Sequence, residues 1–416
     1  MPVTGSPAVE SRVTSGSMSA TRPKSTRPRN RKQQIIAAAS DQFRVSGYHN
    51  VGMADIAEAV GISGPALYRH FSGKNAILHA ALVATIDEGA AAFVREYADL
   101  PEMLDAFAAM LLERREAGVL SERILANLPS EDRQELRERY VASVAPLRES
   151  IARSRPDLAP DGVELLMRAT LAAFGAMRAS AGKLDPARAH RLMVEVGTTI
   201  CRIDTLPVRA AGSGEVRPAP RDRLLPTSRR EAVLAAATRL FAARGYEAVG
   251  MEDIAAAAGG MAGPSLYHHF SSKSAILVAA LTRCLESMLF DMSAALNLSD
   301  DSTQALDAAL ESFVRINFEH GAALTTLLHD VVNVPPEERE IVRRGQLDYL
   351  SEWAALLADH RADLTLSDAR LVAQAVHSVV SALGQRNRVW MRPAYRDEIT
   401  ALGRVMLGLP VPDPSS

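Results

Sequence analysis

The chain has 416 residues, which is enough for two to four domains. Hydrophobic residues make up 47% of the sequence and aromatic residues only 5%, with alanine and leucine abundant, and this composition favours helical cores over sheets. The formal net charge of −2 excludes a uniformly basic nucleic-acid-binding protein, so any affinity for DNA must come from local patches.

Two cysteines, Cys201 and Cys284, lie far apart and have no second cysteine or histidine at metal-ligand spacing. We therefore expect reduced thiols, with a redox switch as the alternative. No apolar run approaches the roughly 18 residues needed to cross a membrane, and the N-terminus lacks the apolar stretch of a signal peptide. The sequence predicts a cytoplasmic protein.

Residues 1–29 are rich in Ser, Thr, Pro and Arg and carry almost no large apolar side chains. Such a segment buries too little surface to offset its ordering entropy, so we expect a disordered basic tail. It is either a solvated tail or an arm that follows DNA phosphates or enters the minor groove beside the next domain.

The next stretch has the layout of a helix-turn-helix domain. Apolar residues at helical spacing predict a first helix, which Gly47 ends, and Gly61 marks the turn between the second helix and the short third one. Pro65 is tolerated in the first turn of that short helix, where no intrahelical donor is lost. The second helix of such a motif enters the major groove of DNA. The predicted helices cover 30–46, 53–60, about 64–71, and 74 to about 97.

From about residue 100 to residue 204 the pattern stays helical, with breaks at prolines and glycines, and the helix lengths suit a bundle. Residues 206–228 have the Pro- and Gly-rich composition of a linker, which would span roughly 60–70 Å if fully extended.

After the linker the same pattern starts again. Phe43-x3-Gly-Tyr recurs at Phe241, and Asp-Ile-Ala at 55–57 recurs 198 residues later. The spacing then becomes 199, and Leu-Tyr-x-His-Phe-x-x-Lys at 67–74 recurs at 266–273. A weaker similarity relates 127–133 to 333–339. We interpret the chain as a duplicated unit of about 200 residues.

These repeated motifs resemble the N-terminal domain of the tetracycline-repressor (TetR/AcrR) family. The resemblance implies an all-α, ligand-responsive transcriptional regulator, mostly a repressor, in which each DNA-binding domain is followed by a helical ligand-binding and dimerisation bundle. Family members normally act as homodimers with two recognition helices in adjacent major grooves. The domains expected here are a tail 1–29, helix-turn-helix domains 30–80 and 229–279, regulatory domains 81–205 and 280–412, and a linker 206–228.

The DNA-binding candidates of the first unit follow from this resemblance and from their chemistry. Tyr68 has a hydroxyl that can bond a phosphate, and Lys74 lies at a helix N-terminus that attracts one. Arg69 can bind guanine bidentately or a phosphate. His70 contacts the DNA backbone or serves packing, whereas Phe71 is expected in the core. The candidates are Ser63, Gly64, Pro65, Ala66, Tyr68, Arg69, His70 and Lys74.

The second unit departs from the first at its turn, which is one residue longer and lacks a counterpart of Ser63, and at His268, which replaces Arg69. Gly52 and Gly250 also stand where many family members carry Thr or Ser as the cap of the second helix. The second recognition helix is therefore expected to bind DNA more weakly, to read a different half-site, or to bind no DNA. Its candidates are Gly263, Pro264, Ser265, Tyr267, His268, His269 and Lys273.

The regulatory domains are where the resemblance implies an effector, which we expect to be apolar. Methionine and phenylalanine side chains of the first copy line a pocket or simply form core. Histidines at 320, 329 and 377 of the second copy are ligand contacts or ordinary helix residues. The candidates in the first copy are Met103, Phe107, Met110, Met167, Phe174 and Met177.

Enzyme signatures such as a phosphate loop, a nucleophile elbow or a metal-ligand cluster are absent from the sequence, so no cofactor and no catalytic activity are expected. The main hypothesis is a tandem-fused regulator in which 161–181 and 186–203 pack against 367–386 and 395–407 as an intrachain pseudo-dimer on one DNA operator. A further homodimer of chains, a scaffold with vestigial readers, and an enzyme on a helical bundle remain alternatives.

Overall fold

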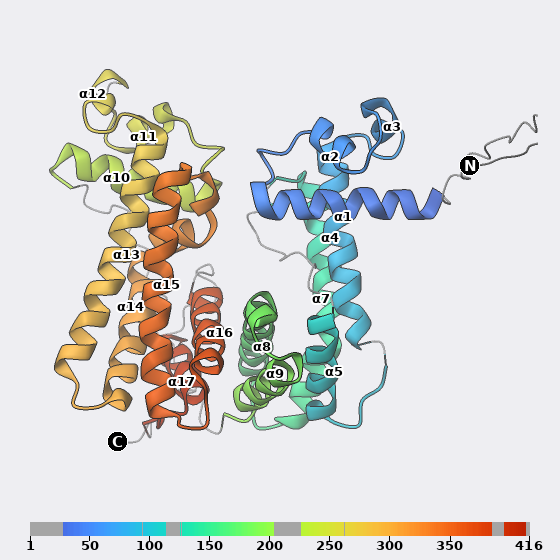
Figure 1. Ribbon diagram of the computed structural model, residues 1–416, viewed down its shortest axis with the longest axis vertical. Helices are drawn as coiled ribbons and strands as arrows, with labels where there is room; N and C mark the ends of the chain where they lie inside the picture. Colours follow the sequence, from blue (N-terminus) through green and yellow to red (C-terminus); the bar gives the residue numbers. More distant parts are fainter. Residues whose placement is uncertain are drawn as a thin grey trace, which may run out of the picture.

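The computed structural model describes residues 28–93, 95–113, 125, 127–203, 226–261, 263–384 and 395–412, and all regular structure in these ranges is helical, as predicted. Two units lie side by side (Figure 1). The first contains α1 (Pro28–Ser46), α2 (Met53–Ala59), α3 (Gly64–Tyr68), α4 (Lys74–Ala90), α5 (Leu100–Glu113), α7 (Ser130–Ser154), α8 (Pro160–Ser180) and α9 (Pro186–Cys201).

The second unit repeats this order, and its fourth and fifth helices are longer than those of the first unit. It contains α10 (Arg229–Arg244), α11 (Met251–Ala257), α12 (Gly263–Tyr267), α13 (Lys273–Leu298), α14 (Ser302–His329), α15 (Pro336–His360), α16 (Leu366–Gly384) and α17 (Tyr395–Leu407). Short 3-10 turns follow α4, α8 and α14 at Ala91–Phe93, Ala181–Lys183 and Val331–Asn333.

Several predicted boundaries are wrong by a few residues. Helix α1 begins at Pro28, inside the segment expected to be disordered, and residues 1–27 lie outside the described residues, as do 206–225 of the predicted linker. Helix α3 ends at Tyr68 because its last turn tightens, with the N–H groups of His70 and Phe71 both donating to the carbonyl of Leu67. This tight turn directs Phe71 into the core, where it is buried with Ile35 and Ala39 of α1, as expected.

Helix α4 ends at Ala90 rather than near residue 97. Together with the turn after it, Lys74–Phe93 is long and apolar enough to cross a membrane by length and composition, so the expectation that no stretch reaches this length is wrong. In the structure it packs against α1 and α7, and Ile77, Leu78 and Leu82 are buried in these contacts. These are the contacts of a core helix.

The two units join through their last helices, which confirms the packing predicted for them. Helix α8 lies against α16, and α9 contacts both α16 and α17. These four helices meet between the units at the end of the molecule remote from α3 and α12 (Figure 1). The Ser378 hydroxyl donates to the carbonyl of Ala172 across the contact at 3.1 Å.

Two ion pairs border this contact. Arg361 Nη2 lies 2.9 Å from Glu195 Oε1, and Arg188 bonds Asp368 Oδ2 through Nε (3.2 Å) and Nη2 (3.0 Å). Burial alone would raise the pKa of Asp368, but the hydrogen bonds from Arg188 and from the Thr365 backbone hold this pKa below its ordinary value. The Asp368 side chain is only 3% exposed, so it depends on these donors.

Both cysteines are free and buried. Burial raises the pKa of Cys201 to about 11 and that of Cys284 to about 12, so neither thiol is a ready nucleophile. The two sulfurs form no disulfide in the structure, and reduced thiols, with a redox switch as the alternative, stay a prediction.

Replacing Arg188 by alanine is expected to lower the free energy of unfolding by roughly 1.5–3 kcal/mol at pH 7, because the buried Asp368 carboxylate loses a charged donor. Since the pKa of Asp368 is depressed in the fold, the contribution is present above about pH 4 and is lost as the pH falls through the folded pKa. Urea unfolding from pH 7 to pH 3 measures this. If the difference in unfolding free energy between wild type and R188A stayed constant from pH 7 to pH 3, the assignment would be contradicted.

Candidate nucleic-acid interface

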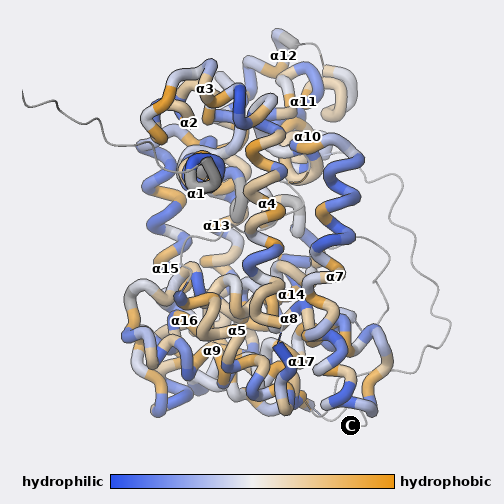
Figure 2. The backbone as a smooth tube through the Cα atoms, turned by 90° about the vertical axis from the view of Figure 1, so that its right-hand side faces the viewer, coloured by the Kyte–Doolittle hydropathy of each residue, from blue (hydrophilic) through white to orange (hydrophobic). Residues whose placement is uncertain are grey.

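The two short helices α3 and α12 lie at the same end of the molecule, each beside the preceding helix of its own unit. Both views show this arrangement, with α1–α3 and α10–α12 together at one end and α9, α16 and α17 toward the other (Figures 1 and 2). In each unit a helix, a glycine turn and a short helix follow one another, and α1 or α10 packs behind them.

The turn of the first unit depends on Gly61, whose φ of 65° lies in the left-handed region that glycine adopts without strain. The N–H of Gly61 donates to the carbonyl of Glu58 at 2.9 Å, and that of Ile62 donates to the carbonyl of Ala57 at 2.9 Å. These bonds close α2 and set the chain direction for α3, which begins after Ser63.

The turn of the second unit is one residue longer but keeps the equivalent backbone hydrogen bond. Gly259 and Gly260 both have positive φ, at 96° and 71°, and the N–H of Met261 donates to the carbonyl of Ala255 at 3.0 Å. This bond is the counterpart of the one between Ile62 and Ala57. The insertion therefore lengthens the loop but leaves the start of α12 in an equivalent position.

The residues after each turn divide into a buried and an exposed face. Leu67 and Phe71, and their counterparts Leu266 and Phe270, are buried, whereas Tyr68 and Tyr267 are each 56% exposed. Tyrosine side chains, which have an apolar ring and a polar hydroxyl, are enriched at interfaces. The outward face of the first unit is completed by Ser63, Pro65, Arg69 and His70, which are exposed, and by Gly64 and Ala66, which are half-buried.

In the second unit Pro264 and His268 are exposed and Ser265 is half-buried, on a helix that begins at Gly263. His269 is half-buried, unlike the exposed His70, and its carbonyl accepts a hydrogen bond from Arg230 Nη1 at 2.8 Å. The exposed set is thus similar in both units, but His268 occupies the place of Arg69.

Lys74 has a structural role that sequence reasoning missed. Its Nζ donates to the carbonyls of Tyr48 and Val51, at 2.8 and 2.9 Å, and lies 4.2 Å from the centre of the Tyr48 ring. Desolvation lowers the pKa of Lys74. Lys273 repeats the arrangement on Tyr246, with one carbonyl contact at 3.0 Å and a ring distance of 4.1 Å. Both ammonium groups fasten the loop before α2 or α11, and phosphate contact by these lysines stays a prediction.

Aspartates stabilise the start of the second helix where family members carry a hydroxyl. The Asp55 carboxylate accepts the N–H of Gly52 at 2.7 Å, and Asp253 accepts that of Gly250 at 2.9 Å. Because this hydrogen bond needs no side chain at Gly52 or Gly250, the missing hydroxyl costs the helix little.

A helix, a left-handed glycine turn and a short helix with an outward tyrosine define a helix-turn-helix DNA-binding domain, and this chain contains two of them. The sequence pattern of bacterial regulatory proteins of the tetR family matches residues 35–81 and 233–280. The chain therefore carries the N-terminal domain of the tetR family twice.

Two relatives match the chain over stretches longer than one copy of the family pattern. The HTH-type transcriptional activator FasR of Mycolicibacterium smegmatis is 41% identical over 104 residues, which are 24% of this chain and 47% of that protein. The HTH-type transcriptional repressor KstR2 of Rhodococcus jostii is 34% identical over 127 residues, which are 30% of this chain and 58% of that protein. The chain thus spans about half the length of the relatives that it matches.

Solved structures of the family resemble the chain over somewhat less than half its length. The TetR-family regulator PfmR from Thermus thermophilus is 26% identical, with a TM-score of 0.39, over 45% of this chain and all of that chain. The ketosteroid transcriptional regulator KstR2 of Mycobacterium tuberculosis is 21% identical, with a TM-score of 0.37, over 44% of this chain and 95% of that chain.

The effector candidates of the first unit lie in a packed core. Phe107 and Phe174 stack with centroids 5.5 Å apart, Phe93 lies 4.9 Å from Phe107, and a Cβ added to Gly197 would come within 2.7 Å of the Phe174 ring. The structure thus brings these residues together as closely packed neighbours, and their part in effector binding stays a prediction. Met103, Met167 and Met177 are buried in the same cluster, and Met110 packs partly buried against it.

The candidate histidines of the second unit have different surroundings. His320 is exposed at a kink in α14, where its φ of −123° and ψ of 24° leave the helical range, and the side chain of His329 lies outside the described residues. His377 is enclosed by the rings of Phe313, Tyr349 and Trp353, at 4.5, 5.5 and 4.7 Å. Burial lowers the pKa of His377 to about 3, so it is neutral near pH 7.

Replacing Lys74 by methionine is expected to lower the free energy of unfolding by about 1–3 kcal/mol, because two buried carbonyls lose a charged donor. The matched variant K273M loses one such bond and should be affected about half as much. Urea unfolding monitored by circular dichroism measures both. The structural role would be refuted by a K74M midpoint equal to that of wild type.

Proposed function

We propose that the protein is a ligand-responsive transcriptional regulator that places both of its recognition helices on one DNA operator. The observation that carries this proposal is the position of α3 and α12 at one end of a single chain, each with a tyrosine 56% exposed. In a homodimer two subunits supply such a pair, whereas here one polypeptide supplies both.

The proposed base contacts come from the start of each recognition helix. Arg69 is the residue of the first unit whose guanidinium can bind guanine bidentately, whereas the imidazole of His268 in the second unit offers a different donor pattern. Gly64, Pro65 and Ala66, with Pro264 and Ser265, allow close approach to the base edges. Because the two readers differ, the operator is an imperfect palindrome.

The proposed phosphate contacts surround these positions. Tyr68 and Tyr267 present their hydroxyl groups from an exposed ring, and His70 is exposed two residues after Tyr68. Lys74 and Lys273 hold the preceding loop and leave positive charge at the N-terminal ends of α4 and α13, where helix N–H groups also attract phosphate.

The proposed effector is a small apolar molecule, bound in the helical bundle after a DNA-binding domain, that favours a spacing of α3 and α12 unsuited to DNA. Among the relatives, FasR is named an activator and KstR2 a repressor. We propose repression, the commoner mode in the family, and a cytoplasmic location. The alternative, a scaffold with vestigial readers, predicts no salt-dependent DNA binding.

Replacing Arg69 by alanine is expected to weaken operator binding by about 1–3 kcal/mol. Guanine contact predicts relaxed discrimination at one base pair, whereas phosphate contact predicts a salt slope reduced by about one and unchanged discrimination. Fluorescence anisotropy with the DNA upstream of the protein's own gene measures both, with R95A as the control because Arg95 lies in a surface pair with Glu102. Undiminished binding by R69A would disprove the assignment.

One chain is expected to occupy one operator, because both readers belong to the same polypeptide. Sedimentation velocity of the protein–DNA complex at micromolar concentration measures this stoichiometry. Two chains per operator, with a footprint that the first domain alone explains, would favour a homodimer of chains.

A further inference from the structure

Three side chains meet between α4 and α7 of the first unit. His79 comes from α4, and Asp132 and Glu135 come from the first two turns of α7. One ligand atom from each lies within 4.8 Å of the other two, and His79 Nε2 is 3.2 Å from Glu135 Oε2. His79 and Asp132 are half-buried, and Glu135 is exposed.

We propose that these three residues bind a divalent transition-metal ion of the zinc type. An imidazole nitrogen and carboxylate oxygens ligate Zn²⁺ at about 2.0–2.2 Å, which in a tetrahedral site places neighbouring ligand atoms about 3.3–3.6 Å apart. The separation of 3.2 Å between His79 Nε2 and Glu135 Oε2 is close to this range, and a carboxylate oxygen of Asp132 lies within 4.8 Å of both atoms. Water would fill the remaining coordination positions.

The charge of the cluster also favours a cation. Two carboxylates face one imidazole, so the three groups carry a net negative charge whether or not His79 is protonated. Arg133, beside Asp132 on α7, donates to the carbonyl of Leu128 at 2.9 Å, and Arg139 bonds both carboxylate oxygens of Asp87 at 2.7 and 2.8 Å. A bound metal ion would offset the repulsion between Asp132 and Glu135.

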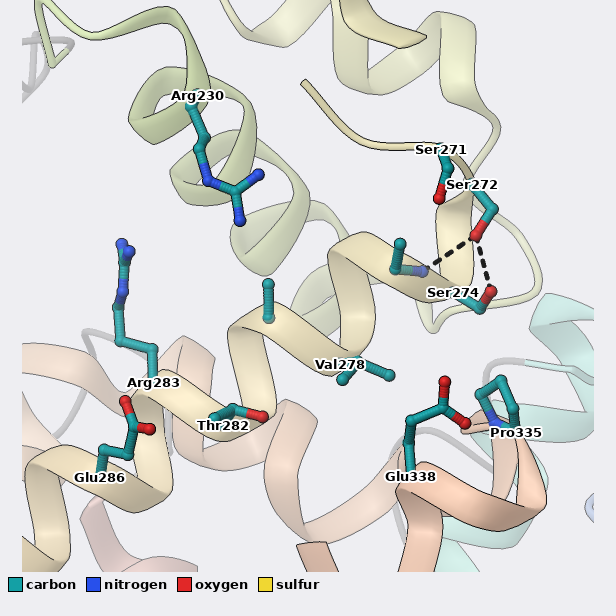
Figure 3. A pocket seen from close by; sticks show the side chains of 12 residues that line it. Arg230, Ser271, Ser272, Ser274, Val278, Thr282, Arg283, Glu286, Pro335 and Glu338 are labelled. Atoms are coloured by element: carbon teal, nitrogen blue, oxygen red, sulfur yellow. Dashed lines mark hydrogen bonds between the residues drawn. The ribbon is translucent and has the colours of Figure 1, made fainter. Parts of the chain in front are cut away.

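The second unit provides an internal comparison at the same place. There the start of α15 and the first turns of α13 border a hollow of about 500 Å³, toward which Val278 and Glu338 face (Figure 3). By the repeat spacing, Val278 replaces His79, Glu338 replaces Asp132, and Ile341 replaces Glu135. The second unit thus keeps one ligand of the three, so one site per chain is expected.

The position of the site gives it a consequence that rests on the proposed function. Helix α4 follows the recognition helix and packs on α1, whereas α7 belongs to the regulatory bundle. A metal ion that joins α4 to α7 would fix the first DNA-binding domain relative to the bundle but would not act on the second. A bound metal ion would therefore alter the contribution of α3 alone to DNA binding.

The test uses the full chain, dialysed against chelator, and isothermal titration with ZnCl₂. We expect one site per chain, and at least tenfold weaker binding in H79V and in E135I, which introduce the residues of the second unit. H190V is the control, because His190 faces a single carboxylate, Asp105, at 3.4 Å. Circular dichroism in chelator checks that every variant is folded. Millimolar Mg²⁺ should not compete, since imidazole favours transition metals.

The proposal is overturned if wild type shows no saturable Zn²⁺ binding, if H79V binds as tightly as wild type, or if Mg²⁺ competes equally. The first result would leave no metal site, the second would leave His79 without a ligand role, and the third would indicate a site for hard cations in place of the zinc-type site. Because this titration contains no DNA, it stands or falls separately from the proposed function. A second titration of operator DNA, with and without Zn²⁺, then shows whether the ion changes DNA affinity.

Discussion

The contact of α8 and α9 with α16 and α17 is the constraint on which the arrangement of the whole molecule depends. Neither short recognition helix can position itself, since each is a five-residue helix that is held only by the side chains behind it. The bundle helices carry these domains, and the four-helix contact fixes one bundle against the other. Arg188 and Asp368, at the border of that contact, link its stability to the charge of one buried carboxylate.

The two units share a framework and differ in their polar details. Both keep the buried leucine and phenylalanine, the outward tyrosine and the lysine over an aromatic ring. They differ at Arg69 and His268, in the length of the turn, and at the α4–α7 junction, where the first unit has His79 and Glu135 and the second has Val278 and Ile341. Packing therefore repeats, whereas the groups available to DNA or to ions do not.

The helical fold and the duplication are predictable from the sequence because they follow from local periodicity and repeated motifs. The joining of the units was predicted from the reach of the linker and from the resemblance to a family of homodimers. The bonds from Lys74 to the carbonyls of Tyr48 and Val51 are not, since they link residues more than twenty positions apart. The meeting of His79 with Asp132 and Glu135 was missed for the same reason. Helix ends were misjudged where a hydrogen bond decides them, as at Leu67, whose carbonyl ends α3.

The placement of Ser378 against Ala172 shows that the partner of each bundle is part of the same chain. In a pair of separate subunits, dilution drives the halves apart, because association depends on protein concentration. Here the effective concentration of one half near the other is set by the covalent connection and is unaffected by how much protein the cell contains. The two bundles of each chain would therefore pair equally well at low and at high concentrations of the protein.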